Sequence, residues 1–237
     1  LRAESRRSLE EPTILSSGTT PFQLNTVNAS NMRFRNILVS GTNASTVFIA
    51  QVANSSNVSM IECTFTFYTA GTTQSICFFS NNTNLILERC SATGVAGGWF
   101  MEGNSGRMIE CYGELVSPNA EAIAALMLIS HDLATRGRFD VSGGTFVATA
   151  TGTTTIGVVQ RCAVHFGNPI TNLHNGLTLD GVAAINRTVG GYSYAASTPN
   201  VAVAAGLRMV GCSGVGALLN INVLAGTAFG QNSWIPS

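Results

Sequence analysis

The segment NVSMIEC at residues 57–63 recurs without gaps as NLILERC at 84–90, SGRMIEC at 105–111 and GLRMVGC at 206–212. Each copy opens on a small turn-forming residue, has a large apolar residue three positions before its cysteine, and ends on that cysteine. Weaker copies begin near residues 31, 138 and 175. Successive copies therefore lie about 21 to 37 residues apart, a spacing typical of solenoids, in which one structural unit stacks on the next.

A second apolar run precedes most copies: VFIAQV (47–52), SICFFS (75–80), GWFMEG (98–103), ALMLIS (125–130) and TIGVVQ (155–160). These runs are short, and residues that favour turns separate them, which is the pattern of short strands. No single unit can bury its own apolar side, but stacking places like residues about 4.8 Å apart in one continuous core. The sequence therefore predicts an all-β fold, a right-handed, single-stranded parallel β-helix.

The same register predicts ladders of like residues along the column. The cysteines of the first three copies stack in adjacent coils, where we expect free, buried thiols that act as small hydrophobic groups. A disulfide between adjacent coils stays open as an alternative, because the six cysteines are an even number. Glu62, Arg89 and Glu110 each precede one of these cysteines, so we expect a Glu–Arg–Glu ladder on the outside of the bend.

We divide the chain into an N-terminal cap or arm at 1–25, the β-helix at 26–225 and a C-terminal cap or tail at 226–237. A solenoid leaves strand edges open at both ends, and other segments must cover them. The charge-dense stretch LRAESRRSLEEP at 1–12 has good helix formers and ends at Pro12, so we expect it to form a short helical cap.

Two segments interrupt the repeat. The Ala-rich stretch at 119–136 is compatible with a helix, but the flanking repeats favour a strand there. The longest interruption is GVAAINRTVGGYSYAASTPN at 181–200, which we expect to be a loop that protrudes from one coil. Loops carry function more often than core strands do.

The composition is poor in charge. Charged residues make up 10% of the chain, against a usual share of about 25%. Twelve Arg balance twelve carboxylates, so a net charge of zero leaves no electrostatic footprint for nucleic acid. No apolar run reaches the roughly 18 residues of a transmembrane helix, and we expect no membrane insertion.

The turn asparagine, the short strand, the aligned apolar position and the closing Cys-Thr-Phe of residues 63–65 resemble the pectate-lyase-like β-helix superfamily over about residues 26 to 225. Within that superfamily, the low charge and the dominance of Ser, Thr, Asn and Gly are most similar to bacteriophage tailspikes and related virion appendages. The resemblance implies an extracellular virion protein that forms a homotrimer, contacts other virion proteins, and meets a polysaccharide on the bacterial surface. Fold does not choose between binding and cleavage.

A glycosidase of this kind needs two carboxyl groups about 5–9.5 Å apart. Most carboxylates beyond the N-terminal segment have a structural explanation, since Glu62, Glu88 and Glu110 belong to the outer ladder and Asp140 and Asp180 lie in repeat bends. The remaining ones are Glu102, Glu114, Glu121 and Asp132.

Glu102 and Glu114 are the candidate catalytic residues, because they lie about one coil apart and each follows an aromatic residue. Trp99 and Tyr112 are the candidate glycan-binding residues, since an aromatic ring stacks on the apolar face of a sugar while a neighbouring acid bonds its hydroxyls. In the alternative interpretation, Trp99 packs at a coil corner and both acids are solvated.

We expect no metal site and no cofactor. The cysteines and histidines lack the spacing of metal ligands, and no acidic cluster of the kind that binds Ca²⁺ in the superfamily's lyases occurs. His131 and Asp132 are adjacent and point to opposite faces of a strand, so they cannot form a dyad. His165 and His174 are isolated, and we interpret them as structural. Six Asn-x-Ser/Thr sequons, which we attribute to chance, begin at Asn28, Asn43, Asn54, Asn57, Asn81 and Asn186.

Three functions remain. The sparse carboxylates favour a viral spike or fibre protein for host-surface glycan adhesion or virion structure, without an enzymatic activity. The second is a polysaccharide depolymerase, a glycoside hydrolase that acts on bacterial surface polysaccharide. The third is a secreted bacterial adhesin, against which the six cysteines and the lack of a signal sequence count.

Overall fold

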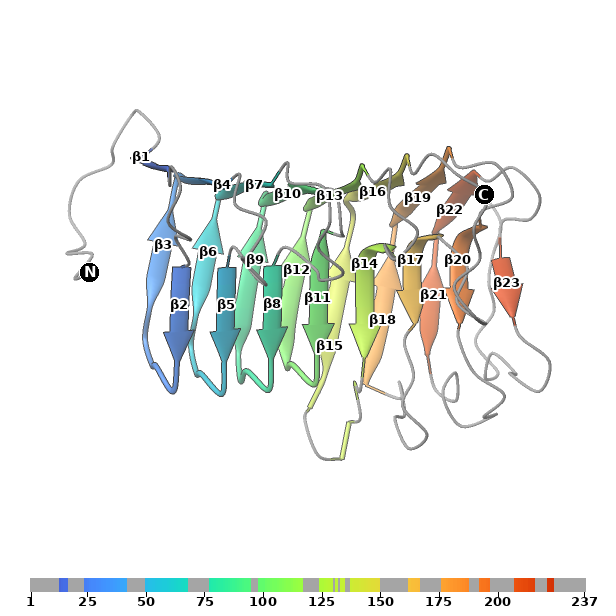
Figure 1. Ribbon diagram of the computed structural model, residues 1–237. Coiled ribbons are helices and arrows are strands. Elements are labelled where there is room, and N and C mark those ends of the chain that lie inside the picture. The colour runs from blue at the N-terminus through green and yellow to red at the C-terminus, as the bar shows by residue number, and fades with distance from the viewer. Residues whose placement is uncertain are drawn as a thin grey trace.

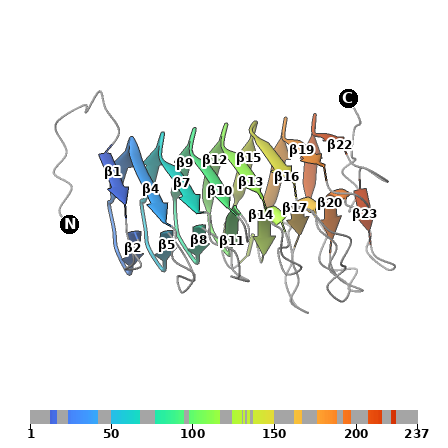
Figure 2. The same cartoon turned by 45° about the horizontal axis from the view of Figure 1, so that its top comes forward.

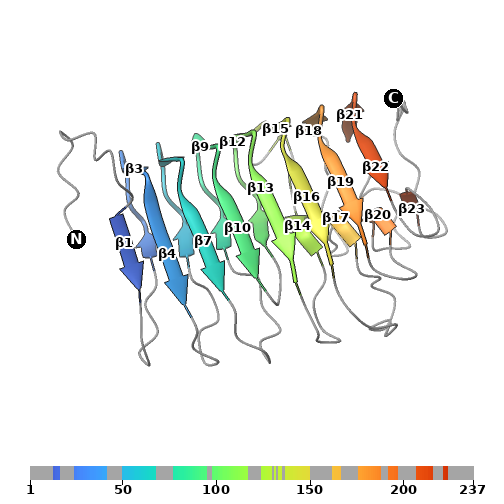
Figure 3. The same cartoon turned by 90° about the horizontal axis from the view of Figure 1, so that it is seen from above.

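The computed structural model is an all-β column of stacked coils in which three parallel sheets form the sides (Figure 1). It describes residues 13–16, 24–41, 50–67, 77–94, 98–116, 124–129, 131, 133–134, 137–149, 162–166, 176–187, 192–196, 207–215 and 221–223. Each coil adds one strand to each sheet, and neighbouring strands pair in parallel and in register. Views from two further sides show the strands of successive coils side by side (Figures 2 and 3).

The three sheets are named A, B and C. Sheet A holds β1 (Thr13–Ser16), β4 (Ile37–Gly41), β7 (Thr64–Phe67), β10 (Ser91–Gly94), β13 (Tyr112–Leu115), β16 (Thr145–Ala148), β19 (Ala183–Asn186) and β22 (Ser213–Val215). Sheet B holds β2 (Leu24–Val27), β5 (Ala50–Ala53), β8 (Cys77–Ser80), β11 (Trp99–Glu102), β14 (Ala124–Ile129), β17 (Cys162–Phe166), β20 (Tyr192–Ala196) and β23 (Ile221–Val223). Sheet C holds β3 (Arg33–Arg35), β6 (Ser59–Ile61), β9 (Leu85–Glu88), β12 (Gly106–Ile109), β15 (Phe139–Ser142), β18 (Leu177–Asp180) and β21 (Arg208–Val210).

In the first coils, a four-residue turn joins the sheet B strand to the sheet C strand. Its sequences are NASN at 28–31, NSSN at 54–57 and NNTN at 81–84, followed by GNSG at 103–106. Every first and last asparagine of these turns has a positive φ, between 50° and 57°. Asparagine is one of the few residues other than glycine that tolerate this left-handed conformation, so the turn accepts it at both positions.

A tighter bend joins sheet C to sheet A. Its first residue is left-handed in every described coil: Asn36, Glu62, Arg89, Glu110, Gly143, Gly181 and Gly211. The predicted charge ladder lies in this bend, where an Arg89 nitrogen is 3.0 Å from a Glu62 oxygen. Arg35 approaches the other Glu62 oxygen at 3.4 Å. These two guanidinium groups, Arg89 first, lower the pKa of the Glu62 carboxyl, while Glu110 acts on Arg89 only through space.

The core is a set of apolar columns inside the three sheets. In sheet C the inward column runs Phe34, Met60, Leu87, Met108, Val141, Leu179, Met209. All are buried. They include the large apolar residue three positions before each aligned cysteine, so the predicted stacking is confirmed. All six cysteines are buried, as expected, and none of them forms a disulfide between coils.

Several segment predictions meet different outcomes. Within the Ala-rich stretch, residues 124–129 form the strand β14, as the repeats indicated. The loop expected at 181–200 is wrong, because β19 and β20 lie within it. Strand pairing places Ala184 directly above the buried Phe146 ring, and a small inward residue fits there although alanine has a low intrinsic preference for strands.

The predicted caps at the two ends of the chain stay predictions. The helical cap at 1–12, the tail at 226–237 and the strand expected at 155–160 lie outside the described residues. β1 and the first half of β2 precede residue 26, so strand pairing already begins within the segment assigned to the N-terminal cap or arm.

Candidate functional site

The outer face of sheet A carries a regular array of hydroxyl groups around Tyr112 and Glu114. One outward column runs Thr64, Ser91, Tyr112, Thr145. The next runs Thr66, Thr93, Glu114, Val147. All of these side chains except Val147 are partly exposed. Strands in register set the rows about 4.8 Å apart, so the hydroxyls form a flat lattice with a fixed repeat.

Tyr112 and Glu114 form one unit at the centre of this face. They are two positions apart on β13, so both side chains point outward, and the Tyr112 hydroxyl donates to Glu114 Oε2 at 2.9 Å. Partial burial, with the bond to Glu114 as the second cause, raises the pKa of the Tyr112 hydroxyl to about 12. The phenol therefore stays protonated near neutral pH and holds the carboxylate in place beside its ring.

The neighbouring coils add hydroxyl groups that are themselves linked. Ser91 Oγ donates to Thr64 Oγ1 at 3.1 Å, across the pairing of β10 with β7. Such groups can both donate and accept. A flat surface with an aromatic ring, a carboxylate and ordered hydroxyls matches the chemistry of a carbohydrate, which has apolar ring faces and many hydroxyls.

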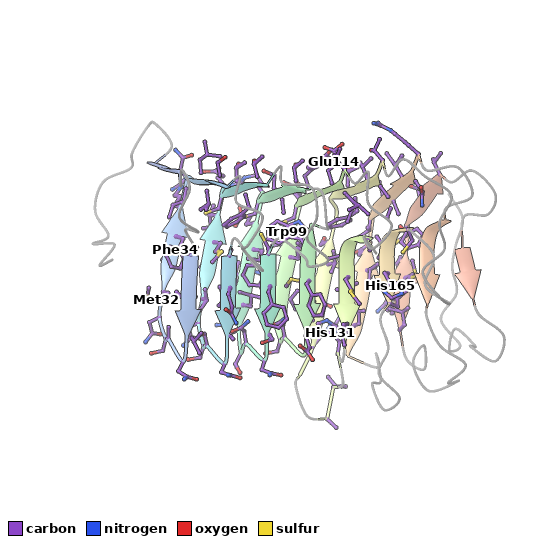
Figure 4. All side chains as sticks on the ribbon, viewed as in Figure 1. Met32, Phe34, Trp99, Glu114, His131 and His165 are labelled. Atoms are coloured by element: carbon purple, nitrogen blue, oxygen red, sulfur yellow. The ribbon has the colours of Figure 1, made fainter. Side chains whose placement is uncertain are left out.

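The structure places Trp99 inside the column and away from this face (Figure 4). Its indole is fully buried and packs against Phe65 and Phe79, with ring centroids 5.9 Å away in both cases. Its Nε1–H donates to the Tyr112 carbonyl oxygen at 2.8 Å. We therefore assign Trp99 to the core, in line with the alternative interpretation of the sequence, and leave it out of the candidate site.

Gly113 explains why the indole fits inside. Its position on β13 is inward, and a Cβ there would lie 3.0 Å from Trp99 Cδ1 and 2.7 Å from Phe146 Cδ1. The missing side chain thus leaves the space that the indole uses.

Glu102 does not lie beside Glu114. Glu102 belongs to β11 in sheet B and pairs with Ser80 and Ile129, whereas Glu114 belongs to sheet A. Both side chains point outward, but from different faces of the column. The structure therefore does not bring together the two carboxylates that we considered as a hydrolytic pair.

The described histidines are buried. His131 stacks on Phe139 with ring centroids 5.0 Å apart, and its two nitrogens lie 3.3 Å from the carbonyl oxygens of Asn104 and Met101. Burial lowers the pKa of His131 and of His165 to about 4. Asp132 and His174 lie outside the described residues.

Most of the charged residues that the structure describes lie on one side of the column. Among the charged residues that the structure describes, all but Glu102, Glu114 and Arg187 lie on sheet C or in the turns that flank it. The outer faces of sheets A and B are therefore almost neutral. The described part of the chain contains no group of three or more His, Cys, Asp or Glu side chains placed to hold a metal ion.

Sequence reasoning missed the first asparagine of each four-residue turn. The signal was present as Asn-x-Ser/Thr-Asn at 28–31, 54–57 and 81–84. This turn also generates the sequons at Asn28, Asn54 and Asn81, so their regular occurrence follows from the architecture and not from chance.

Comparisons with known proteins add no relative. No family model, no curated protein and no solved structure matches the chain. Among the described residues, no helix is long and apolar enough to span a membrane.

Proposed function

We propose that the chain is a virion spike or fibre protein whose β-helical column binds a polysaccharide on the surface of a bacterial host. The observation that carries the proposal is the outer face of sheet A, where Tyr112 and Glu114 are joined at 2.9 Å within an array of hydroxyls. The sequence resemblance to virion appendages, with the parallel stacked sheets, gives the context. We also propose right-handed winding, because nearly all crossovers between parallel strands have that hand.

The assembly part of the proposal rests on the distribution of charge. Contacts between three copies, and with other virion proteins, would use the neutral outer face of sheet B, while the outer face of sheet A stays free for the polysaccharide and the charged face of sheet C stays in water. Covering neutral surface avoids the desolvation cost of burying unpaired charges. Light scattering coupled to gel filtration tests this, since the proposal expects the mass of three chains and a monomer would contradict it.

Binding is tested with polysaccharide purified from the surface of candidate host bacteria. We expect Tyr112→Ala and Glu114→Gln each to weaken binding about tenfold or more. The first variant removes hydrogen bonds to a hydroxyl that is held in place, and the second removes hydrogen bonds to a charged carboxylate. Arg208→Gln, an exposed change on sheet C, is the matched control and should bind like the unmodified chain. Equal binding by all four proteins would remove the face of sheet A from the proposal.

A depolymerase is the alternative function, and the separation of Glu102 from Glu114 on two sheets counts against it. Incubation with the same polysaccharide, followed by sizing of the products, distinguishes cleavage from binding. We expect binding without shortened products. Oligosaccharides that are released by the unmodified chain but not by Glu102→Gln or Glu114→Gln would favour the depolymerase.

A further inference from the structure

The turns between sheets B and C form a second polar surface, on a different edge of the column from the candidate site. The turns that join β2 to β3, β5 to β6 and β8 to β9 lie side by side in three successive coils (Figure 1). We call their outward residues the asparagine strip: Asn28, Ser30, Asn31, Asn54, Ser56, Asn57, Asn81, Thr83 and Asn84. The strip contains no charged residue.

The inner side of these turns is fixed by buried hydrogen bonds. Ser55, Asn82 and Asn104, at the second turn position, are at most 2% exposed. The Ser55 backbone N–H donates to Asn82 Oδ1 at 3.0 Å, and Asn82 Nδ2 donates to Asn104 Oδ1 at 2.8 Å. The turns are therefore locked to one another from inside, and the outward groups are held at a regular spacing before any ligand arrives.

The two outer asparagine columns differ in their bonding. In the column Asn31, Asn57, Asn84 the side-chain amides bond one another, at 3.1 Å and 2.9 Å. The amides of Asn28, Asn54 and Asn81 make no hydrogen bond among the residues that the structure describes. Asn28 and Asn54 are exposed, and Asn81 is partly exposed. The amides of the one column are thus bonded to one another, and the other column presents three unused donor and acceptor sets.

Backbone geometry does not require asparagine at this first position. The next coil has Gly103 there, with a φ of 58° and the same backbone bond to the following coil as Asn28, Asn54 and Asn81. Glycine adopts this conformation without a steric cost, so the three amides are an addition to what the turn needs.

We propose that Asn28, Asn54 and Asn81 bind a neutral carbohydrate chain that lies along the column. Each carboxamide offers two donors and one acceptor group, which suits a pair of sugar hydroxyls. The amides repeat about every 4.8 Å, close to the length of one sugar unit in an extended glycan, and Ser30, Ser56 and Thr83 add hydroxyls beside them. The inference rests on the proposed function for the source of the glycan, and adds a contact separate from Tyr112 and Glu114.

The test compares two triple variants with the unmodified chain. Asn28→Gly/Asn54→Gly/Asn81→Gly removes the unused amides and keeps the left-handed turns. Asn31→Gly/Asn57→Gly/Asn84→Gly removes the bonded column and is the matched control. Circular dichroism checks that both fold, and binding is measured to host-surface polysaccharide and to dextran, a neutral glucan. Side-chain amide NMR signals of the unmodified chain provide a direct readout.

We expect the affinity of the first triple variant for the polysaccharide to fall about tenfold or more. The affinity of the control variant should fall by less than half of that factor. We also expect the amide signals of Asn28, Asn54 and Asn81 to shift on titration. If the first variant binds host polysaccharide as tightly as the unmodified chain does, the proposal for the asparagine strip is overturned and the proposed function stands. If host polysaccharide does not bind but dextran binds and depends on the three asparagines, the proposed function fails and the strip is upheld. Binding of neither glycan overturns both.

Discussion

Replacing His165 with leucine measures how far one buried histidine weakens this column in acid. His165 lies on the outer side of sheet B, in register with Met127 and Ala195 (Figure 4). His165 is 1% exposed, and neither of its ring nitrogens has a hydrogen-bond partner among the described residues. Burial alone lowers its pKa from 6.5 to about 4.

The sign and size of the effect follow from proton binding. The unfolded chain takes up a proton at His165 below about pH 6.5, whereas the folded chain does so only below about pH 4. Stability therefore falls as the pH drops through this window and levels off below it. The loss is about 2 kcal/mol at pH 5 and about 3 kcal/mol below pH 4, at about 1.4 kcal/mol for each pKa unit. Leucine removes this loss. At neutral pH it also removes two unpaired buried nitrogens, which should raise the free energy of unfolding by about 1–3 kcal/mol.

Urea unfolding of both proteins at a series of pH values between 7 and 4 provides the measurement. We expect the stability difference in favour of His165→Leu to grow by about 2 kcal/mol between pH 7 and pH 5. His131, which is also buried, stays in both proteins and cancels in the difference. A difference that stays constant with pH, or a ring titration by NMR near pH 6.5 in the folded chain, would refute the reasoning.

Three further predictions concern the core. Gly113→Ala should lower the free energy of unfolding by about 1–3 kcal/mol in thermal melts, because its Cβ would lie 2.7 Å from Phe146 Cδ1; an unchanged melt would show that the ring can move. Asn82→Ala should cost about 2 kcal/mol or more by urea unfolding, since it leaves buried partners unpaired, and a smaller loss would show that water replaces the amide. The Cys111 thiol and then burial raise the pKa of Cys90 to about 12, against a lowering by Cys63, so thiol reagents should label it at neutral pH only in urea; labelling of the folded chain would contradict the buried ladder.

Much of the fold was predictable because the residues that stack on one another in a solenoid recur at a regular spacing along the sequence. The aligned cysteines and the large apolar residue before each of them show which positions stack, and the structure stacks Met60 on Leu87 and Leu87 on Met108. The free thiols followed from the same register. The expected loop at 181–200 failed because small residues such as Ala184 have little strand preference of their own and gain it from their neighbours.

Only two of the four predicted site residues, Tyr112 and Glu114, form the candidate site in the structure. Tyr112 and Glu114 are two residues apart on one strand, so local geometry alone puts them on one side, and the sequence by itself determined that pair. Whether Glu102 joins them depends on the turn and bend that separate sheet B from sheet A, and whether Trp99 points inward depends on the space that Gly113 leaves in the next coil. Those outcomes were decided only by the tertiary structure, because they arise from contacts between strands and not from spacing along the chain.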